Sequence, residues 1–222
     1  REKEDPSRKI AVVERGRLGF GASGRNAGFI TCGSVEHFNR LVSKHGLEEA
    51  TAIWRFSETN LKLLEEHVIQ GDGTSLQFEK KGCYSLAAQD AEFTELKKVA
   101  EMMAKLKIPT QTFSEAEIEK NVGARKFVGG IKYLEDASIH PVRLLERMAQ
   151  KTPGLTLIES TEVHGFEATS EGTRLVKTDG GDFECSMVVW ALNGYSAQMH
   201  PYFADKIYPT RGQILMMEKV PR

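Results

Sequence analysis

The chain has 222 residues, of which 40% are hydrophobic and 27% are charged, a balance typical of a globular protein with a buried core. Its formal net charge is −1, its three cysteines lack metal-ligand spacing, and no apolar run approaches the ~20 residues that span a membrane. We therefore expect a cytoplasmic protein with no nucleic-acid partner, no metal centre and no transmembrane segment.

The N-terminal segment carries the most informative pattern. Residues 1–5 are charged and stop before Pro6, as in the last turn of a helix. A short strand is predicted over residues 10–13, followed by the acid Glu14 and a loop with five glycines up to position 28. An acid at the carboxyl edge of a parallel strand can accept both hydroxyl hydrogens of an adenosine ribose. Small residues let backbone N–H groups approach a phosphate or a flat ring, so both features suit a dinucleotide.

The segment before this acid is shorter than such a site requires. A dinucleotide-binding fold normally has a strand and a G-x-G-x-x-G turn about 20 residues before the acid. Only nine residues precede Ile10 and none is glycine, so we expect a piece of a longer protein. The alternative is a complete small α/β domain in which Glu14 merely ends a strand.

Helices are predicted next. Apolar residues at three- and four-residue steps indicate helix over residues 35–69, broken in two at Gly46. Residues 71–75 read as a loop, and residues 76–88 as one or two strands turning near Gly82. An amphipathic helix is expected over residues 90–105, and a capping box at residues 114–117 predicts a short helix to about Asn121.

The remaining pattern alternates between strands and helices. Residues 127–140 predict a strand and a loop, and Pro141 suits the first position of a helix reaching about Lys151. A strand over residues 155–159 precedes three strand-like runs between 161 and 189, which indicate a β-meander. The continuously apolar residues 187–190 are typical of a strand buried in a parallel sheet. A turn over 191–194, a helix-like segment over 195–200 and a strand over 211–218 follow.

These elements predict a mixed α/β fold of two interleaved domains. Residues 1–35 and 140–200 are assigned to a dinucleotide-binding domain with a partial Rossmann-like parallel sheet and a β-meander. Residues 36–139 and 205–222 are assigned to a substrate domain with helices and a mixed antiparallel sheet. Such an arrangement commonly holds a cofactor over a substrate pocket.

Motifs in a fixed order support one family resemblance. They are Glu14-Arg15, Ala-Ser-Gly-Arg-Asn-Ala-Gly at 22–28, residues 81–86, Asp136 with residues 139–141, and residues 161–163, 188–194 and 209–213. Together they resemble the D-amino-acid oxidase superfamily of FAD-dependent oxidoreductases over nearly the whole chain. Ser-Gly-Arg-Asn at 23–26 with Asn-Gly-Tyr at 193–195 is most similar to the γ-glutamylputrescine oxidase and amine-oxidase-like branch.

The resemblance implies a non-covalent FAD site. Glu14 would bind the adenosine ribose, and Arg15 would lie beside the adenine. The other implied contacts are Ala22 and Ser23 to the pyrophosphate or ribityl chain, Ala27, Gly28 and Phe29 to the isoalloxazine ring, Val163 to adenine, and Ala191, Asn193 and Gly194 to the adenosine. Arg25 would pair with the cofactor or bond loop carbonyls. Because Arg25 and Asn26 stand where a related branch carries a flavin-linked histidine, we expect no histidyl bond.

The implied activity is oxidation of the C–N bond of an amine or amino acid by hydride transfer to flavin N5. Oxygen or an electron-carrier protein would then accept the electrons. Two alternatives stay open: an FAD-dependent 2-hydroxy acid or polyol dehydrogenase, and a catalytically inactive fragment that serves only as a nucleotide-binding or interaction domain. We expect the catalytic residues beyond Arg222, and therefore no turnover by this chain alone.

Structural roles are expected for most other reactive side chains. Cys32 reads as an inert small apolar residue, since nothing beside it in sequence would lower the pKa of its thiol. His140 is expected to cap a helix or lie in a loop. Lys80 and Lys81 could face a substrate carboxylate but fit a solvated strand face better, and Arg211 suits an active site or a salt bridge equally.

Overall fold

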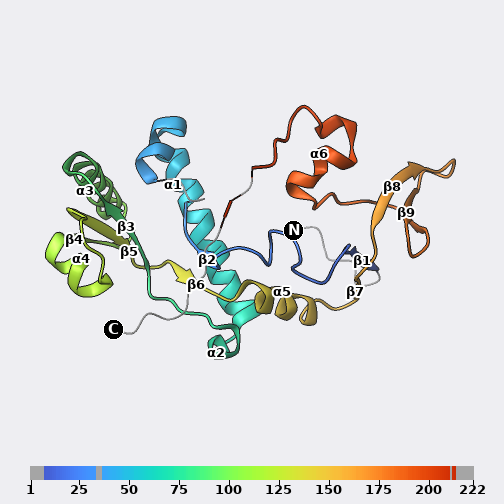
Figure 1. Cartoon of the computed structure of the whole chain (residues 1–222), viewed down its shortest axis with the longest axis horizontal. Coiled ribbons are helices and arrows are strands. Elements are labelled where there is room, and N and C mark those ends of the chain that lie inside the picture. Colours follow the sequence, from blue (N-terminus) through green and yellow to red (C-terminus); the bar gives the residue numbers. More distant parts are fainter. Residues whose placement is uncertain (1–7, 34–36, 211, 214–222) are drawn as a thin grey trace. The chain divides into compact units, whose positions relative to one another are not determined.

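The computed structural model describes residues 8–33, 37–210 and 212–213 (Figure 1). The chain divides into two compact units, Arg1–Ala27 with Met148–Arg222 (the first unit) and Gly28–Arg147 (the second unit). The predicted helical turn at residues 1–5 and almost all of the predicted strand at 211–218 lie outside the described residues. The assignment of a cofactor domain and a substrate domain stays a prediction.

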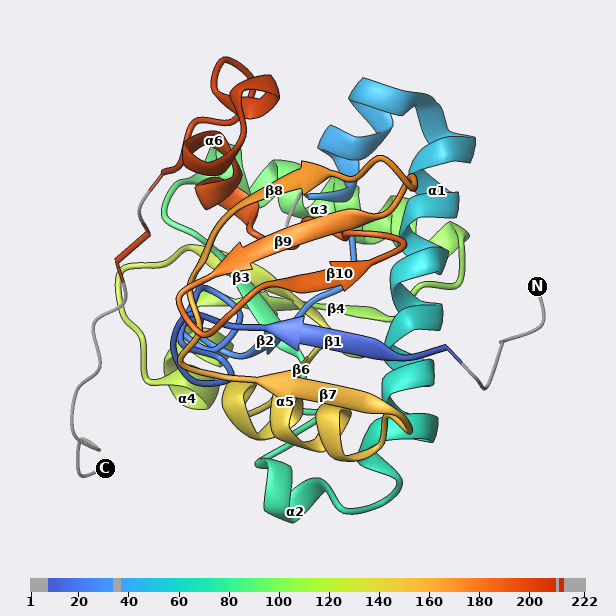
Figure 2. The same cartoon turned by 90° about the vertical axis from the view of Figure 1, so that its right-hand side faces the viewer.

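The first unit contains a parallel strand pair and an antiparallel meander. Strand β1 (Ile10–Val13) pairs in parallel with β7 (Leu155–Ile158), in a register that places Val13 opposite Ile158. Strands β8 (Val163–Ala168), β9 (Arg174–Thr178) and β10 (Phe183–Cys185) form an antiparallel sheet in the order β10-β9-β8. Figure 2 shows these three strands side by side. Both the strand before Glu14 and the β-meander are therefore confirmed.

The predicted buried strand at residues 187–190 is wrong. The segment has no regular secondary structure, and the side chains of Met187 and Val189 are 72% and 80% exposed. An apolar strand is stable in a parallel sheet only when neighbouring strands and covering layers bury it. The parallel sheet of the described residues has only two strands, β1 and β7, and neither pairs with this segment. The chain continues into three short helices, η2 (Asn193–Tyr195), α6 (Ser196–Met199) and η3 (Pro201–Phe203), of which α6 corresponds to the helix-like segment predicted over residues 195–200.

A long helix opens the second unit. Helix α1 (Phe38–Leu64) is interrupted at Gly46, whose φ of 80° and ψ of 166° are not helical, and it continues into the π-helix η1 (Glu65–Ile69). This confirms the predicted break, since glycine adopts such a conformation without a Cβ penalty. The loop predicted at residues 71–75 is wrong in part. Asp72 accepts a hydrogen bond from the Ser75 backbone N–H at 3.4 Å and thereby caps the short helix α2 (Gly73–Leu76).

An antiparallel sheet and two capped helices complete the second unit. The sheet has the order β3 (Cys83–Ala87), β5 (Gly129–Tyr133), β4 (Thr110–Ser114), and a separate pair joins β2 (Phe29–Ile30) to β6 (Ala137–Ser138). Helix α3 (Asp90–Lys105) has the predicted bounds, and α4 (Glu115–Val122) begins at the predicted capping box. Helix α5 (Pro141–Gln150) begins at Pro141 as expected.

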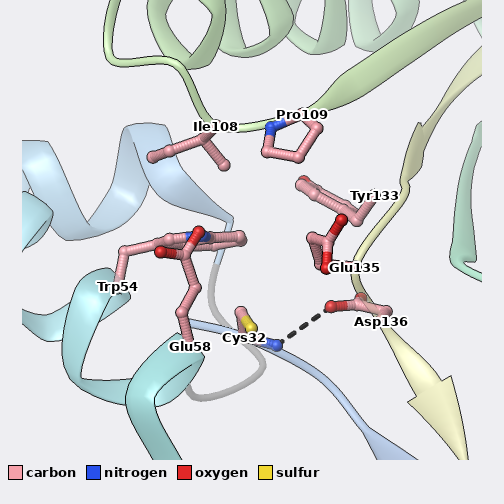
Figure 3. A pocket seen from close by; sticks show the side chains of 8 residues that line it. All are labelled: Cys32, Trp54, Glu58, Ile108, Pro109, Tyr133, Glu135 and Asp136. Atoms are coloured by element: carbon pink, nitrogen blue, oxygen red, sulfur yellow. Dashed lines mark hydrogen bonds between the residues drawn. The ribbon is translucent and has the colours of Figure 1, made fainter. Parts of the chain in front are cut away.

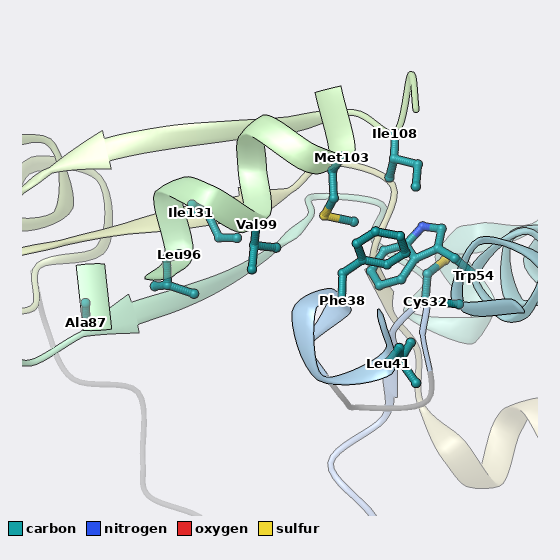
Figure 4. Close-up of a cluster of buried hydrophobic side chains, with 11 residues drawn as sticks. Cys32, Phe38, Leu41, Trp54, Ala87, Leu96, Val99, Met103, Ile108 and Ile131 are labelled. Atoms are coloured by element: carbon teal, nitrogen blue, oxygen red, sulfur yellow. The ribbon is translucent and has the colours of Figure 1, made fainter. Parts of the chain in front are cut away.

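The main hydrophobic core lies in the second unit (Figure 4). Helix α3 packs against all three strands of the sheet. The largest side chains that this core buries almost completely come from α1, α3 and β5, namely Phe38, Met103, Ile131 and Val99. Edge-to-face contact between Phe38 and Trp54, at a centroid distance of 5.8 Å, joins the start and the middle of α1. Within the described residues, no helix has the length and apolar character needed to cross a membrane.

Candidate functional site

Glu14 lies at the carboxyl end of β1 and is held by the loop that follows it. The Gly16 N–H donates to Glu14 Oε1 at 2.8 Å, and the Glu14 N–H donates to Ile158 O of β7 at 2.9 Å. The side chain is half-buried. Its second oxygen, Oε2, accepts no hydrogen bond from any described residue, so it can accept one from a ligand hydroxyl.

A second acid occupies the equivalent position on the neighbouring strand. Glu159 directly follows β7, and its carboxylate accepts a hydrogen bond from the Leu18 N–H. The carboxyl ends of adjacent parallel strands meet at one edge of a sheet, where ligands of open α/β folds bind. Glu159 was not among the residues predicted from the sequence. The sequence does show an acid directly after a second short apolar strand, and this pattern could have indicated Glu159.

Three segments of the first unit converge around Glu14. The Thr161 N–H donates to Glu14 O at 3.0 Å, and the Ser160 N–H donates to Gly16 O at 2.7 Å. These bonds place the start of β8 next to the acid, and β8 begins with Val163, which pairs with Thr178. Val163 was predicted to contact adenine, and the structure places it two residues from a direct neighbour of Glu14.

Arg15 contacts the third segment, residues 193–195, at the carboxyl end of β1. Its guanidinium lies 3.7 Å from the Glu162 carboxylate and 5.8 Å from the ring centroid of Tyr195. Tyr195 ends the helical turn that starts at Asn193, so Asn193 and Gly194 are adjacent in sequence to a contact of Arg15. Asn193 has a left-handed φ of 47°, and Ala191 is exposed. These contacts bring Glu14 and Arg15 to residues 160–162 and to Tyr195, and the predicted residues Val163, Asn193 and Gly194 adjoin them in sequence. Glu162 and Tyr195 were not predicted as site residues, because sequence spacing does not predict such a contact.

The glycine loop is compact around Gly24. A Cβ at this position would lie 2.0 Å from Gly19 O, so two backbone segments are in direct contact there. The Asn26 side-chain amide donates to Ala22 O at 3.1 Å and to Ser23 O at 2.8 Å. Ala22 and Ser23 are exposed, and their N–H groups have no acceptor among the described residues.

Arg25 makes a contact within the glycine loop, whereas the end of the loop contains the boundary between the two units. The Arg25 guanidinium lies 4.8 Å from the centroid of the Phe20 ring, which is a cation–π contact within the loop. Ala27 is exposed and ends the first unit, whereas Gly28 and Phe29 begin the second. Gly28 is buried with a φ of 73°, and the Ile139 N–H donates to its carbonyl oxygen at 2.9 Å. Phe29 is 69% exposed.

The second unit has a small pocket of its own, shown in Figure 3. Trp54, Tyr133 and Cys32 line it together with Ile108, Pro109 and three acids, Glu58, Glu135 and Asp136. Arg55 pairs with Glu58 at 2.6 Å and Lys80 pairs with Glu135 at 2.9 Å, so two of the acids already have cationic partners. Asp136 accepts a hydrogen bond from the Cys32 N–H at 3.1 Å and is 3% exposed.

Several other reactive side chains make structural contacts. Burial and the nearby Asp136 charge raise the pKa of the Cys32 thiol to about 12, so this cysteine stays protonated. His140 Nδ1 accepts a hydrogen bond from the Arg143 N–H at 3.4 Å in the first turn of α5, which confirms a capping role. Lys80 pairs with Glu65 at 3.0 Å as well as with Glu135, and Lys81 pairs with Glu79. Both lysines precede β3, so the strand face expected for them is wrong. Across the described ranges, His, Cys, Asp and Glu side chains form no group of three suited to a metal ion.

Asp136 makes the stability of the second unit pH-dependent. Burial raises its pKa to about 6, whereas an unfolded aspartate titrates near ~3.9. The folded state therefore binds more protons between these values, and stability falls as the pH rises from about 4 to about 6. Asp136→Asn keeps an acceptor for the Cys32 N–H and removes the buried charge. We expect this variant to exceed the unsubstituted protein in stability at pH ~7 by about 2 kcal/mol.

Urea unfolding followed by tryptophan fluorescence measures this difference. The chain has two tryptophans, so a Trp190→Phe background leaves Trp54, in the second unit, as the reporter. The gain from Asp136→Asn should be present at pH ~7 and disappear at pH ~4, because both forms are then uncharged. An equal gain at both pH values would show that the charge of Asp136 is not its cause.

Comparison with known proteins gives one family. A family model described as "DAO: FAD dependent oxidoreductase" matches residues 3–222. "Probable oxidoreductase OrdL" of Haemophilus influenzae is 24% identical over 98% of this chain and 52% of its own length. "Gamma-glutamylputrescine oxidoreductase" of Escherichia coli is 21% identical over 95% of this chain and 50% of its own.

A solved structure shares the fold. The crystal structure of glycine oxidase from Geobacillus kaustophilus superposes with a TM-score of 0.66 at 22% identity, covering 86% of this chain and 50% of that one. In sequence, the same enzyme is 23% identical over 94% of this chain and 55% of its own length. The chain thus spans about half the length of the curated relatives it matches.

Proposed function

This chain belongs to the DAO family of FAD-dependent oxidoreductases, and we propose that its first unit holds the adenosine end of FAD in a protein that oxidises the C–N bond of an amine or amino acid. The observation that carries the proposal is the meeting of Glu14 and Arg15 with residues 160–162 and Tyr195 at the carboxyl end of β1. The family match over residues 3–222 supports the choice of FAD.

The residues at this edge have the chemistry that the cofactor requires. Glu14 Oε1 is fixed by the Gly16 N–H, so the carboxylate is oriented while Oε2 is free to accept a ribose hydroxyl. The planar Arg15 guanidinium is restrained by Glu162 and by the Tyr195 ring, and its face can stack on a purine. The exposed N–H groups of Ala22 and Ser23 can donate to phosphate oxygens. The donor and acceptor set therefore fits FAD.

The chemistry proposed for the whole protein follows the amine-oxidising relatives. When bound, FAD would supply the acceptor for the hydride that leaves the carbon of the C–N bond. The chain's own residues would bind and orient the adenosine and pyrophosphate, and the site contains no histidine at positions 25–26, so we propose non-covalent binding. The names of the glycine oxidase and γ-glutamylputrescine relatives support an amine or amino acid as substrate.

Flavin retention by Glu14 variants tests the proposal. We expect the chain, mixed with FAD and desalted, to keep the flavin absorption bands. Glu14→Gln should weaken binding roughly 10- to 100-fold, since hydrogen bonds to a charged group contribute about 1.5–3 kcal/mol. Glu171→Gln, an exposed acid between β8 and β9, should bind like the unsubstituted chain.

The two possible failures have different meanings. Equal binding by Glu14→Gln and Glu171→Gln would refute the role of Glu14. The absence of flavin from the unsubstituted chain would show that this chain does not hold FAD by itself. Flavin reduction by amines, amino acids and 2-hydroxy acids, compared in a version extended to the length of the relatives, then tests the substrate class.

A further inference from the structure

The segment that follows β7 is bonded to the loop that begins at Glu14. The Thr161 N–H donates to Glu14 O at 3.0 Å, and the Ser160 N–H donates to Gly16 O at 2.7 Å. Gly16 is held from two sides, because its own N–H donates to Glu14 Oε1 at 2.8 Å. The orientation of the Glu14 carboxylate therefore depends on the position of Gly16.

Glu159 adds a third bond between the same two segments, and this bond uses its side chain. The Leu18 N–H donates to Glu159 Oε1. The three bonds fall in turn on Glu14, Gly16 and Leu18, so residues 159–161 hold every second residue of the loop. A charged acceptor makes a stronger hydrogen bond to a backbone N–H than a neutral acceptor does. Glu159 therefore fixes the far end of a loop whose near end carries Glu14.

Residues 159–161 are themselves anchored to the β-meander. The Thr161 hydroxyl donates to Glu159 O at 3.1 Å, and Thr161 is only 9% exposed. The next residue, Glu162, donates its N–H to Asp179 Oδ1 at 2.9 Å, and its carbonyl oxygen accepts from the Asp179 N–H at 3.3 Å. Asp179 directly follows β9, the central strand of the meander. The meander thus supplies a fixed base for the bonds to the loop.

The backbone at Ser160 has an unfavourable conformation that the neighbouring bonds maintain. Its φ of 53° is left-handed, which a residue with a Cβ adopts at a cost. Such conformations persist where the surrounding contacts fix them, and they are frequent at functional sites. The bonds of Glu159 and Thr161, on either side of Ser160, provide contacts of this kind.

We propose that Glu159 is a positioning residue of the adenosine site, which holds the loop at residues 15–18 so that the Glu14 carboxylate stays oriented toward a ribose hydroxyl. The role toward FAD rests on the proposed function, whereas the effect on the loop does not. Without the bond to Leu18 the loop loses one fixed point, and the Gly16 N–H leaves Glu14 Oε1 more often. The carboxylate then adopts other orientations, which a ligand must restrict again when it binds, so affinity falls.

Hydrogen exchange of the Gly16 amide, followed in ¹H–¹⁵N spectra, tests the effect on the loop without flavin. Glu159→Ala removes the acceptor, whereas Glu159→Gln keeps a side-chain oxygen at the same distance from the backbone. We expect the Gly16 amide to exchange about three- to tenfold faster in Glu159→Ala, as for one lost hydrogen bond, and less than about twofold faster in Glu159→Gln. Glu171→Ala, at the exposed acid between β8 and β9, should leave the rate unchanged. Equal acceleration in the amides of β9 would indicate general destabilisation and would overturn the proposal.

FAD affinity provides the second measurement. Glu159→Ala should raise the dissociation constant about three- to tenfold, and Glu159→Gln should restore the affinity of the unsubstituted chain. In a Glu14→Ala background, Glu159→Ala should change the dissociation constant by less than about twofold, because Glu159 acts through the carboxylate that is then missing. Equal losses in both backgrounds, equal losses for the alanine and glutamine variants, or unchanged Gly16 exchange in Glu159→Ala would overturn the proposal. The absence of FAD binding by the unsubstituted chain would count against the proposed FAD site, and Gly16 exchange would still decide whether Glu159 holds the loop.

Discussion

Replacing Phe38 by alanine should lower the free energy of unfolding of the second unit by about 3–5 kcal/mol, the range measured when large aromatic side chains are removed from protein cores. Phe38 is completely buried at the first position of α1. It contacts the Trp54 ring edge-to-face, and it belongs to the cluster that includes Met103 and Val99 of α3. The alanine variant would lose the transfer free energy of the ring and leave a cavity between the two helices.

An exposed phenylalanine on the same helix provides the control. Phe56 is 77% exposed, so Phe56→Ala should change stability by no more than ~0.5 kcal/mol. Urea unfolding followed by Trp54 fluorescence, in the Trp190→Phe background, compares the two variants directly. Equal losses for Phe38→Ala and Phe56→Ala would contradict the assignment of Phe38 to the core.

Patterns that depend on local interactions could be predicted from the sequence. The acid after β1, the capping box at Ser114 and the amphipathic stripe of α3 involve residues close in sequence, and the structure has each of them. Gly46 was identified as a break because few residues other than glycine adopt its backbone conformation. Local chemistry decides these elements, and tertiary packing only confirms them.

Elements that depend on distant partners could not be predicted in the same way. Strand β4 has a polar sequence, Thr-Gln-Thr-Phe-Ser, in which only Phe113 is buried, and it forms because β5 offers an edge for pairing. Residues 187–190 show the opposite case, since their apolar sequence predicts a strand but no described strand pairs with them. A hydrophobic pattern indicates that a segment can be buried, and the available partners determine whether it is.

The same distinction between local and distant interactions applies to the residues of the candidate site. Glu14 and the glycine loop were predicted because their residue types and spacing are local features. Glu159, Glu162 and Tyr195 reach the site through pairing of β1 with β7 and through the contacts of Arg15, over separations of about 140 to 180 residues. An acid after a short strand is visible in the sequence at Glu159, but no spacing rule predicts that residues so far apart meet, and only the folded chain brings them together.

Replacing Gly28 by alanine should destabilise the second unit by more than about 2 kcal/mol, even without any cofactor. Gly28 has a φ of 73°, a left-handed conformation that a Cβ disfavours. The added Cβ would also lie 2.0 Å from Ile139 O, a backbone atom that cannot move aside without breaking the β2–β6 pair. The variant must therefore lose the bond from the Ile139 N–H to Gly28 O.

Gly123→Ala separates the backbone strain of Gly28→Ala from the clash with Ile139. Gly123 has nearly the same φ, 75°, but nothing lies within 4 Å of the added Cβ. It should cost only the backbone strain, about 1 kcal/mol, so the excess loss in Gly28→Ala measures the clash with Ile139. Trp54 fluorescence during urea unfolding follows both variants in the same unit. Equal losses would mean that the backbone conformation alone requires glycine at position 28. A larger loss for Gly28→Ala would mean that internal packing requires this glycine, whether or not a flavin ring lies against it.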